Sequence, residues 1–160
     1  MYFNIHRLER SMLMSTNPLK NKKDASPVTF IHACRGLKFP EKLLQASALK
    51  IYSQRKIPSK KCLNVVLCSD HAIKKLNTFF RGKPRPTDVL SFNYDDDDLL
   101  GEIYISLQRA AIQARRYGVS YESEIERLFI HGMLHLLGFD HETAPQRKRM
   151  EALENRFMTR

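Results

Sequence analysis

The sequence contains no tryptophan, only three cysteines and no run of 18 consecutive apolar residues. Without such a run, a transmembrane helix is excluded. The cysteines (Cys34, Cys62 and Cys68) are odd in number and show no C-x-x-C spacing. They indicate neither a disulfide framework nor a cysteine zinc site. The interpretation is three buried thiols in a reducing cytosol, hence a cytoplasmic protein.

The composition is that of a small basic protein. Of 160 residues, 42% are hydrophobic and 28% charged, the balance of a soluble globular chain. This length favours one domain with its own core. Lysine and arginine number 27 against 17 acidic residues, a formal charge of +10. Basic residues spread over several elements would attract the phosphate backbone of a nucleic acid.

Hydrophobic periodicity divides the chain into two parts. Residues 1–26 form a poorly patterned basic extension, and residues 27–160 form a single domain. In that domain the pattern predicts strands at 28–32, 62–68, 87–94 and 101–106, and helices at 41–54, 70–80, 107–117, 121–137 and 144–158. Strands in the middle with helices on either side predict an α+β fold, with a small mixed β-sheet and one antiparallel hairpin packed against helices.

Chemistry concentrates in the segment HGMLHLLGFDH. His131 and His135 are four residues apart on a helix that is apolar nearly all round, so they share one face of a buried element. Gly138 can turn the chain back at the end of that helix and bring His141 to the same side. Three imidazoles fit a tetrahedral metal ion whose fourth position is open. Zn²⁺ suits them best, although Ni²⁺ or Cu²⁺ would bind the same ligands in vitro.

The residue after the first histidine bears on the kind of chemistry. H-x3-H-x5-H is also the spacing of metzincin metalloproteases, and zinc proteases of the H-E-x-x-H type use the glutamate as a general base. Here that position is Gly132, which has no side chain. Glycine inside a buried helix costs about 1 kcal/mol relative to alanine, so we expect a need for space, either a closely packed strand or room over the metal. A metalloprotease is therefore only a distant alternative.

One arginine and several carboxylates complete the candidates. Arg81 lies in FFRGKPRPTD, a loop between a helix and a strand, where a guanidinium can clamp a phosphate and stabilise charge in phosphoryl transfer. Asp88, Glu102, Asp140 and Glu142 are candidates for a general acid or base, or for hydrogen-bonding the second nitrogen of a ligand imidazole. For Asp140, next to a ligand, the second role is preferred.

Together with LNTFFRGKPRPTDVLSF (76–92), GEIYIS (101–106) and RMEALE (149–154), the histidine motif resembles the YbeY family of bacterial rRNA maturation endoribonucleases. The resemblance implies that residues 27–160 are a metal-dependent hydrolase domain in which His131, His135 and His141 hold one zinc ion. It also implies that Arg81 is the arginine used for activity. The implied function is cleavage of single-stranded RNA in 16S rRNA 3′-end maturation and ribosome quality control.

Expected partners follow from the same resemblance. They are an rRNA precursor and the small ribosomal subunit, with a small-subunit ribosomal protein and an assembly GTPase as further family expectations, and no membrane. The alternative is a zinc-containing assembly factor that binds RNA or the ribosome and has little intrinsic cleavage activity. An open coordination position would favour the enzyme, whereas a fourth protein ligand would favour the structural zinc site.

Overall fold

A mixed β-sheet lies at the centre of the computed structural model, which describes residues 3–5, 26–34, 36–94 and 96–159. Within these residues the strands form one sheet in the order β1-β4-β5-β3-β2. They are β1 (Phe3–Ile5), β2 (Val28–His32), β3 (Cys62–Cys68), β4 (Val89–Tyr94) and β5 (Leu99–Ser106). β4 and β5 are antiparallel, and the other neighbouring pairs are parallel. The predicted mixed sheet with one antiparallel hairpin is confirmed.

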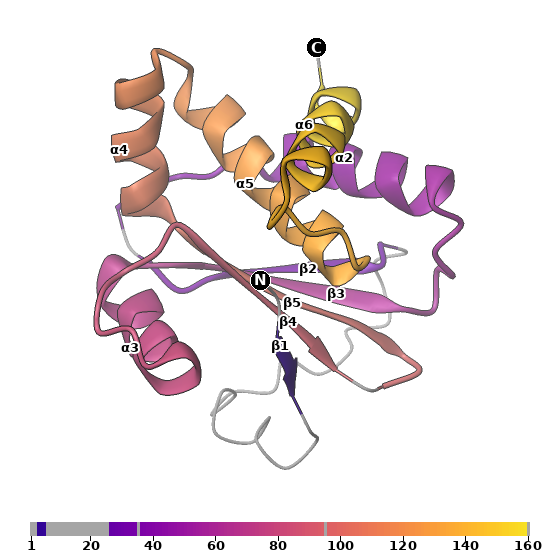
Figure 1. The fold of residues 1–160 in the computed structure, drawn as a ribbon, viewed down its shortest axis with the longest axis horizontal. Helices are drawn as coiled ribbons and strands as arrows, with labels where there is room; N and C mark the ends of the chain where they lie inside the picture. Colours follow the sequence, from indigo (N-terminus) through magenta and orange to yellow (C-terminus); the bar gives the residue numbers. More distant parts are fainter. Residues whose placement is uncertain (1–2, 6–25, 35, 95, 160) are drawn as a thin grey trace.

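The helices cover both faces of this sheet. They are α2 (Glu41–Gln54), α3 (Asp70–Arg81), α4 (Leu107–Tyr117), α5 (Tyr121–Leu136) and α6 (Ala144–Phe157). Figure 1 shows α2, α4, α5 and α6 on one side of the sheet and α3 on the other. None of the helices in the described residues is long and apolar enough to cross a bilayer. The predicted α+β architecture is confirmed.

Alternation along the strands builds two separate cores. In β5, Ile103 and Ile105 join the cluster that contains the buried side chains of α5, whereas Tyr104 joins the smaller cluster under α3. In β3, Val65 and Val66 divide between the two clusters in the same way. Because successive side chains of a strand point to opposite faces, the sheet separates groups on α3 from groups on α5.

The first strand was not evident from the sequence pattern. β1 pairs parallel to β4, with Phe3 opposite Phe92, and so adds an edge to the sheet from within the basic extension. Three residues are too few for periodicity to distinguish a strand from a loop. Residues 6–25 of the extension lie outside the described residues.

Candidate metal centre

The candidate site lies at the C-terminal end of α5 and in the turn that follows. Ser120 caps the start of α5 by accepting a hydrogen bond from the Ser123 backbone N–H (3.1 Å). After the helix ends, Gly138 adopts a left-handed φ of +83°, and its N–H donates to the His135 carbonyl (2.9 Å). This conformation is readily accessible only to glycine. The turn returns the chain to the helix at His141.

The three predicted histidines converge. Their ring centroids are separated by 4.6 Å (His131 and His135), 5.2 Å (His131 and His141) and 5.0 Å (His135 and His141). One donor nitrogen from each lies within 4.8 Å of the other two, and no further His, Cys, Asp or Glu among the described residues joins this group. Two ligands of a tetrahedral zinc ion, each about 2.05 Å from the metal, are about 3.4 Å apart. The cluster therefore has suitable dimensions for one ion.

The electrostatics of the cluster also fit a metal. Burial, with the neighbouring His131, lowers the pKa of His135 to about 3, and burial likewise lowers the pKa of His141. Both imidazoles are therefore neutral at pH 7 and keep the lone pairs that a metal needs. Their Nδ1 atoms are buried and, among the described residues, have no hydrogen-bond partner. No hydrogen bond to Nδ1 within the described chain therefore fixes the tautomer of either ring.

A carboxylate orients the first histidine. Glu154 Oε1 on α6 lies 2.6 Å from Nδ1 of His131. Because a carboxylate can only accept, Nδ1 carries the proton and Nε2 keeps its lone pair. That Nε2 lies 3.0 Å from Nε2 of His135, inside the cluster.

Glu154 was not a sequence-predicted site residue, although one signal was present. It falls four residues after Met150 and three before Phe157, on the buried face of α6. An acidic residue at such a position needs a partner. Its second oxygen lies 4.0 Å from the guanidinium of Arg127, which also binds Glu124 through two hydrogen bonds (2.6 and 3.0 Å).

Of the predicted carboxylates, Asp140 lies beside the cluster. Its Oδ1 accepts the backbone N–H of His141 (2.8 Å), and this bond contributes most to lowering the pKa of Asp140. The distance from Oδ1 to Nδ1 of His141 is 3.8 Å, too long for a hydrogen bond. Asp140 therefore contacts the backbone of His141 and not its ring.

Glu102 does not contact the histidines. It is fully buried in β5, and because Ile103 faces α5, Glu102 faces α3. Its Oε2 accepts from the hydroxyl groups of Tyr94 (2.9 Å) and Tyr104 (3.0 Å), and its Oε1 accepts from Asn64 Nδ2 (3.2 Å). In place of the predicted position beside a ligand imidazole, Glu102 links side chains on the other face of the sheet.

Strands pack closely against Gly132 and leave no room for a side chain, which is one of the two reasons that the sequence suggested for a glycine here. A Cβ on Gly132 would lie 2.8 Å from Ile103 Cγ2 and 3.0 Å from Ser91 Oγ. The Ser91 hydroxyl donates to the Gly132 carbonyl (3.2 Å). A side chain here would point at the β4–β5 hairpin. The position that carries the general base in H-E-x-x-H proteases therefore faces the sheet.

We expect Gly132→Ala to lower the free energy of unfolding by about 1–3 kcal/mol, because overpacking a tight contact forces strain into its neighbours. Denaturant melts of wild type, Gly132→Ala, Ile103→Ala and the double variant measure the coupling free energy between positions 132 and 103. Ile103→Ala removes the methyl groups closest to the new Cβ. The double variant should therefore lose less unfolding free energy than the sum of the losses in the two single variants. Strict additivity would mean that this contact is not what excludes alanine.

Arg81 lies apart from the cluster. It is the last residue of α3 and lines a hollow of about 450 Å³ together with Lys83, Arg85 and Arg109. None of the three histidines lines this hollow. The structure thus brings the predicted metal ligands together, and Arg81 lines a hollow that these histidines do not line.

Fold and site together define a class: a single-domain α+β protein whose central helix ends in an open cluster of three histidines. The family model described as endoribonuclease YbeY matches residues 36–160. The endoribonuclease YbeY of Acholeplasma laidlawii is 42% identical over 106 residues, covering 65% of this chain and 77% of that protein. The endoribonuclease YbeY of Sulfurihydrogenibium is 35% identical over 130 residues, covering 78% and 85%.

A solved structure agrees with these relatives. The solution structure of a Thermotoga maritima protein matches with a TM-score of 0.57 and 34% identity, covering 81% of this chain and 85% of that one. The chain belongs to the YbeY endoribonuclease family.

Proposed function

We propose that this protein is a zinc-dependent endoribonuclease that cuts single-stranded RNA. The observation that carries the proposal is the convergence of three imidazoles with no fourth protein ligand among the described residues. The side chain of His141 is 43% exposed, so the cluster opens toward solvent on that side. A structural zinc site would be closed by a fourth ligand, whereas a catalytic one keeps a position open.

The residues have distinct roles in this proposal. His131, His135 and His141 hold the ion, Glu154 fixes the tautomer of His131, and Asp140 holds the backbone of His141. Zinc bound by three neutral ligands supplies a Lewis acid that polarises a phosphoryl oxygen or activates water. We propose zinc as the physiological ion, with Ni²⁺ or Cu²⁺ able to substitute in vitro.

We propose that Arg81 contributes to activity by binding a phosphate of the RNA. A guanidinium can hold phosphate oxygens through two parallel hydrogen bonds. Since Arg81 lines a hollow that none of the three histidines enters, this phosphate is not the one at the bond that is cut.

The proposed biological role is 3′-end maturation of 16S rRNA and ribosome quality control in the cytoplasm. The substrate would be an rRNA precursor in the small ribosomal subunit, with a small-subunit ribosomal protein and an assembly GTPase as partners. Family membership supports this role. The second candidate is an assembly factor that binds RNA or the ribosome and uses zinc only for structure. The open cluster favours the enzyme, and Gly132 facing the sheet disfavours a protease.

Metal removal tests the proposal. Protein treated with a chelator should lose at least about 99% of its cleavage rate on a single-stranded 16S precursor 3′ fragment, because several kcal/mol of transition-state stabilisation are lost. One equivalent of zinc should restore the rate. The same fragment annealed to its complement should resist cleavage, and a melting curve of the chelated protein checks that it stays folded.

Two results would contradict this proposal. If chelated and zinc-loaded protein cut equally, the cleavage is independent of the histidine cluster. If zinc-loaded protein binds the fragment or small ribosomal subunits without cutting, the assembly-factor alternative replaces the enzyme. Product ends separate two routes of cleavage: a 2′,3′-cyclic phosphate indicates attack by the ribose hydroxyl and excludes direct attack by water as the main route.

A further inference from the structure

The hollow at the end of α3 has a chemistry of its own. It lies between α3, the loop that leads to β4, and α4. We call it the basic hollow, defined by the cations that line it: Arg81, Lys83, Arg85 and Arg109. Among its lining residues the only acid is Asp88. The ligand that such a hollow suits is an anion.

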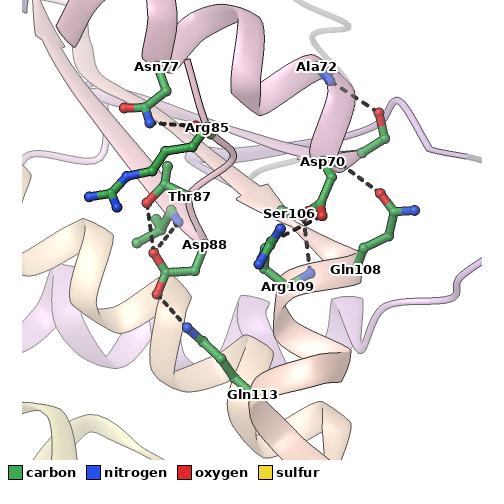
Figure 2. Close-up of polar contacts among 12 residues, drawn as sticks. Asp70, Ala72, Asn77, Arg85, Thr87, Asp88, Ser106, Gln108, Arg109 and Gln113 are labelled. Carbon is green, nitrogen blue, oxygen red and sulfur yellow. Dashed lines mark hydrogen bonds and ion pairs between the residues drawn. The ribbon is translucent and has the colours of Figure 1, made fainter. Parts of the chain in front are cut away.

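Asp88 does not neutralise these cations directly. Figure 2 shows its carboxylate between Thr87 and Gln113. It accepts hydrogen bonds from Thr87 Oγ1 (3.1 Å), the Val89 backbone N–H (2.9 Å) and Gln113 Nε2 (2.9 Å). Burial alone would raise the pKa of Asp88, but these hydrogen bonds outweigh burial and lower it. The carboxylate is thus ionised and engaged in joining β4 to α4.

The cations differ in how they are held. Arg109 Nε donates to Asp70 Oδ2 (3.1 Å), and Ser106 Oγ donates to the other oxygen of Asp70 (2.6 Å), as Figure 2 shows. Within the part of the chain that the structure describes, the side chains of Lys83 and Arg85 have no carboxylate within ion-pair distance, and both residues are exposed. Two of the cations are therefore free to bind a ligand from solution.

The loop that carries these cations is fixed before any ligand binds. Gly82 ends α3 with a left-handed φ of +63°, and the N–H of Lys83 donates to the Asn77 carbonyl (3.2 Å). The Asn77 side chain, 2% exposed, donates to the carbonyl of Arg85 (2.7 Å; Figure 2). A preorganised site loses less conformational entropy on binding.

The hollow and the histidine cluster lie at opposite ends of β5. Leu136, next to His135, packs against Gly101 near the start of the strand. At its other end, the N–H of Ser106 donates to the carbonyl of Asp88 (2.8 Å). The five residue steps from Gly101 to Ser106 span about 17 Å at 3.4 Å each. We therefore expect a ligand in the hollow to lie away from the bond that is cut at the cluster.

We propose that the basic hollow binds backbone phosphates of single-stranded RNA several nucleotides away from the cleaved bond. This inference rests on the proposed function, because it assigns the hollow to the same substrate. Backbone contacts of this kind position a strand without reading its sequence. Each phosphate contact to a single strand also contributes about −0.7 to the slope of log K against log salt concentration.

The test compares two double variants that remove the same charge. Lys83→Gln with Arg85→Gln removes the two exposed cations of the hollow that have no ion pair, and Lys42→Gln with Lys60→Gln removes two exposed lysines elsewhere. Arg81 stays intact in both. Binding of a single-stranded RNA oligonucleotide is measured by fluorescence anisotropy over a range of salt. We expect the slope of log K against log salt concentration to become less steep by about 1.4 in the hollow variant, from two contacts at about 0.7 each. The slope of the control should stay close to that of wild type.

Cleavage kinetics and a conservative variant complete the test. In the hollow variant the loss of kcat/KM should appear mainly in KM, and Arg85→Lys, which keeps the charge, should recover most of the binding. Equal salt slopes for the hollow and control variants would overturn the inference while leaving zinc-dependent cleavage untouched. If wild type binds RNA through the hollow but does not cut, the hollow remains an RNA-binding site, and the proposed enzyme fails.

Discussion

Replacing His135 by alanine is expected to abolish RNA cleavage and to lower zinc affinity by roughly a hundredfold. His135 is 4% exposed, and its ring centroid lies 4.6 Å from that of His131 and 5.0 Å from that of His141. Structural zinc sites contribute about 10–16 kcal/mol through four ligands, so one ligand accounts for roughly 3 kcal/mol. The two remaining histidines would also lack the three-ligand geometry that leaves one coordination position of the ion open to the substrate.

Zinc content after dialysis and a chelator-dye competition measure the first effect, and the RNA cleavage time course measures the second. The matched control is His71→Ala, which removes an exposed imidazole from α3, outside the cluster. A thermal melt separates loss of zinc from loss of the fold, since His135→Ala also removes a buried side chain. Full cleavage by folded His135→Ala would exclude the cluster as the reaction centre.

The metal cluster was predictable because it depends on local geometry. The spacing of His131 and His135 puts them on one helical face, and Gly138 supplies the turn that returns His141. Both relations are contained in eleven consecutive residues. The sheet was predictable for a related reason, since a short and nearly continuous apolar run such as 62–68 is typical of a strand buried on both faces.

The roles of the carboxylates depend on packing between distant segments, so the sequence could not rank them. Glu102 and Glu154 are both buried acids, yet one binds two tyrosines and an asparagine while the other binds a histidine 23 residues earlier. Strand alternation turns Glu102 toward α3, opposite to Gly101 and Ile103, whereas Glu154 lies on α6 on the other side of the sheet. The position of Arg81 has the same cause, because only the assembled sheet shows that α3 and α5 lie on opposite faces.

The contact between Glu154 and His131 leads to the second large effect. We expect Glu154→Gln to weaken zinc binding by roughly 10–100-fold, the usual cost of losing the partner of a ligand imidazole. Glutamine is close in size, so packing beside Met150 and Phe157 is kept. The loss is that of charge, because a neutral amide stabilises the Nδ1 proton of His131 less than a carboxylate does.

Arg127 allows the expected loss of zinc affinity in Glu154→Gln to be distinguished from a loss of folding. Its guanidinium keeps both hydrogen bonds to Glu124 when Glu154 becomes neutral, so the stability of α5 should change little. The readout is zinc affinity by chelator competition, with Glu151→Gln as the control because it removes an exposed carboxylate from the same helix. Equal zinc affinity in wild type and both variants would show that Glu154 only anchors α6. A loss confined to Glu154→Gln makes it the residue that holds His131 ready for the ion.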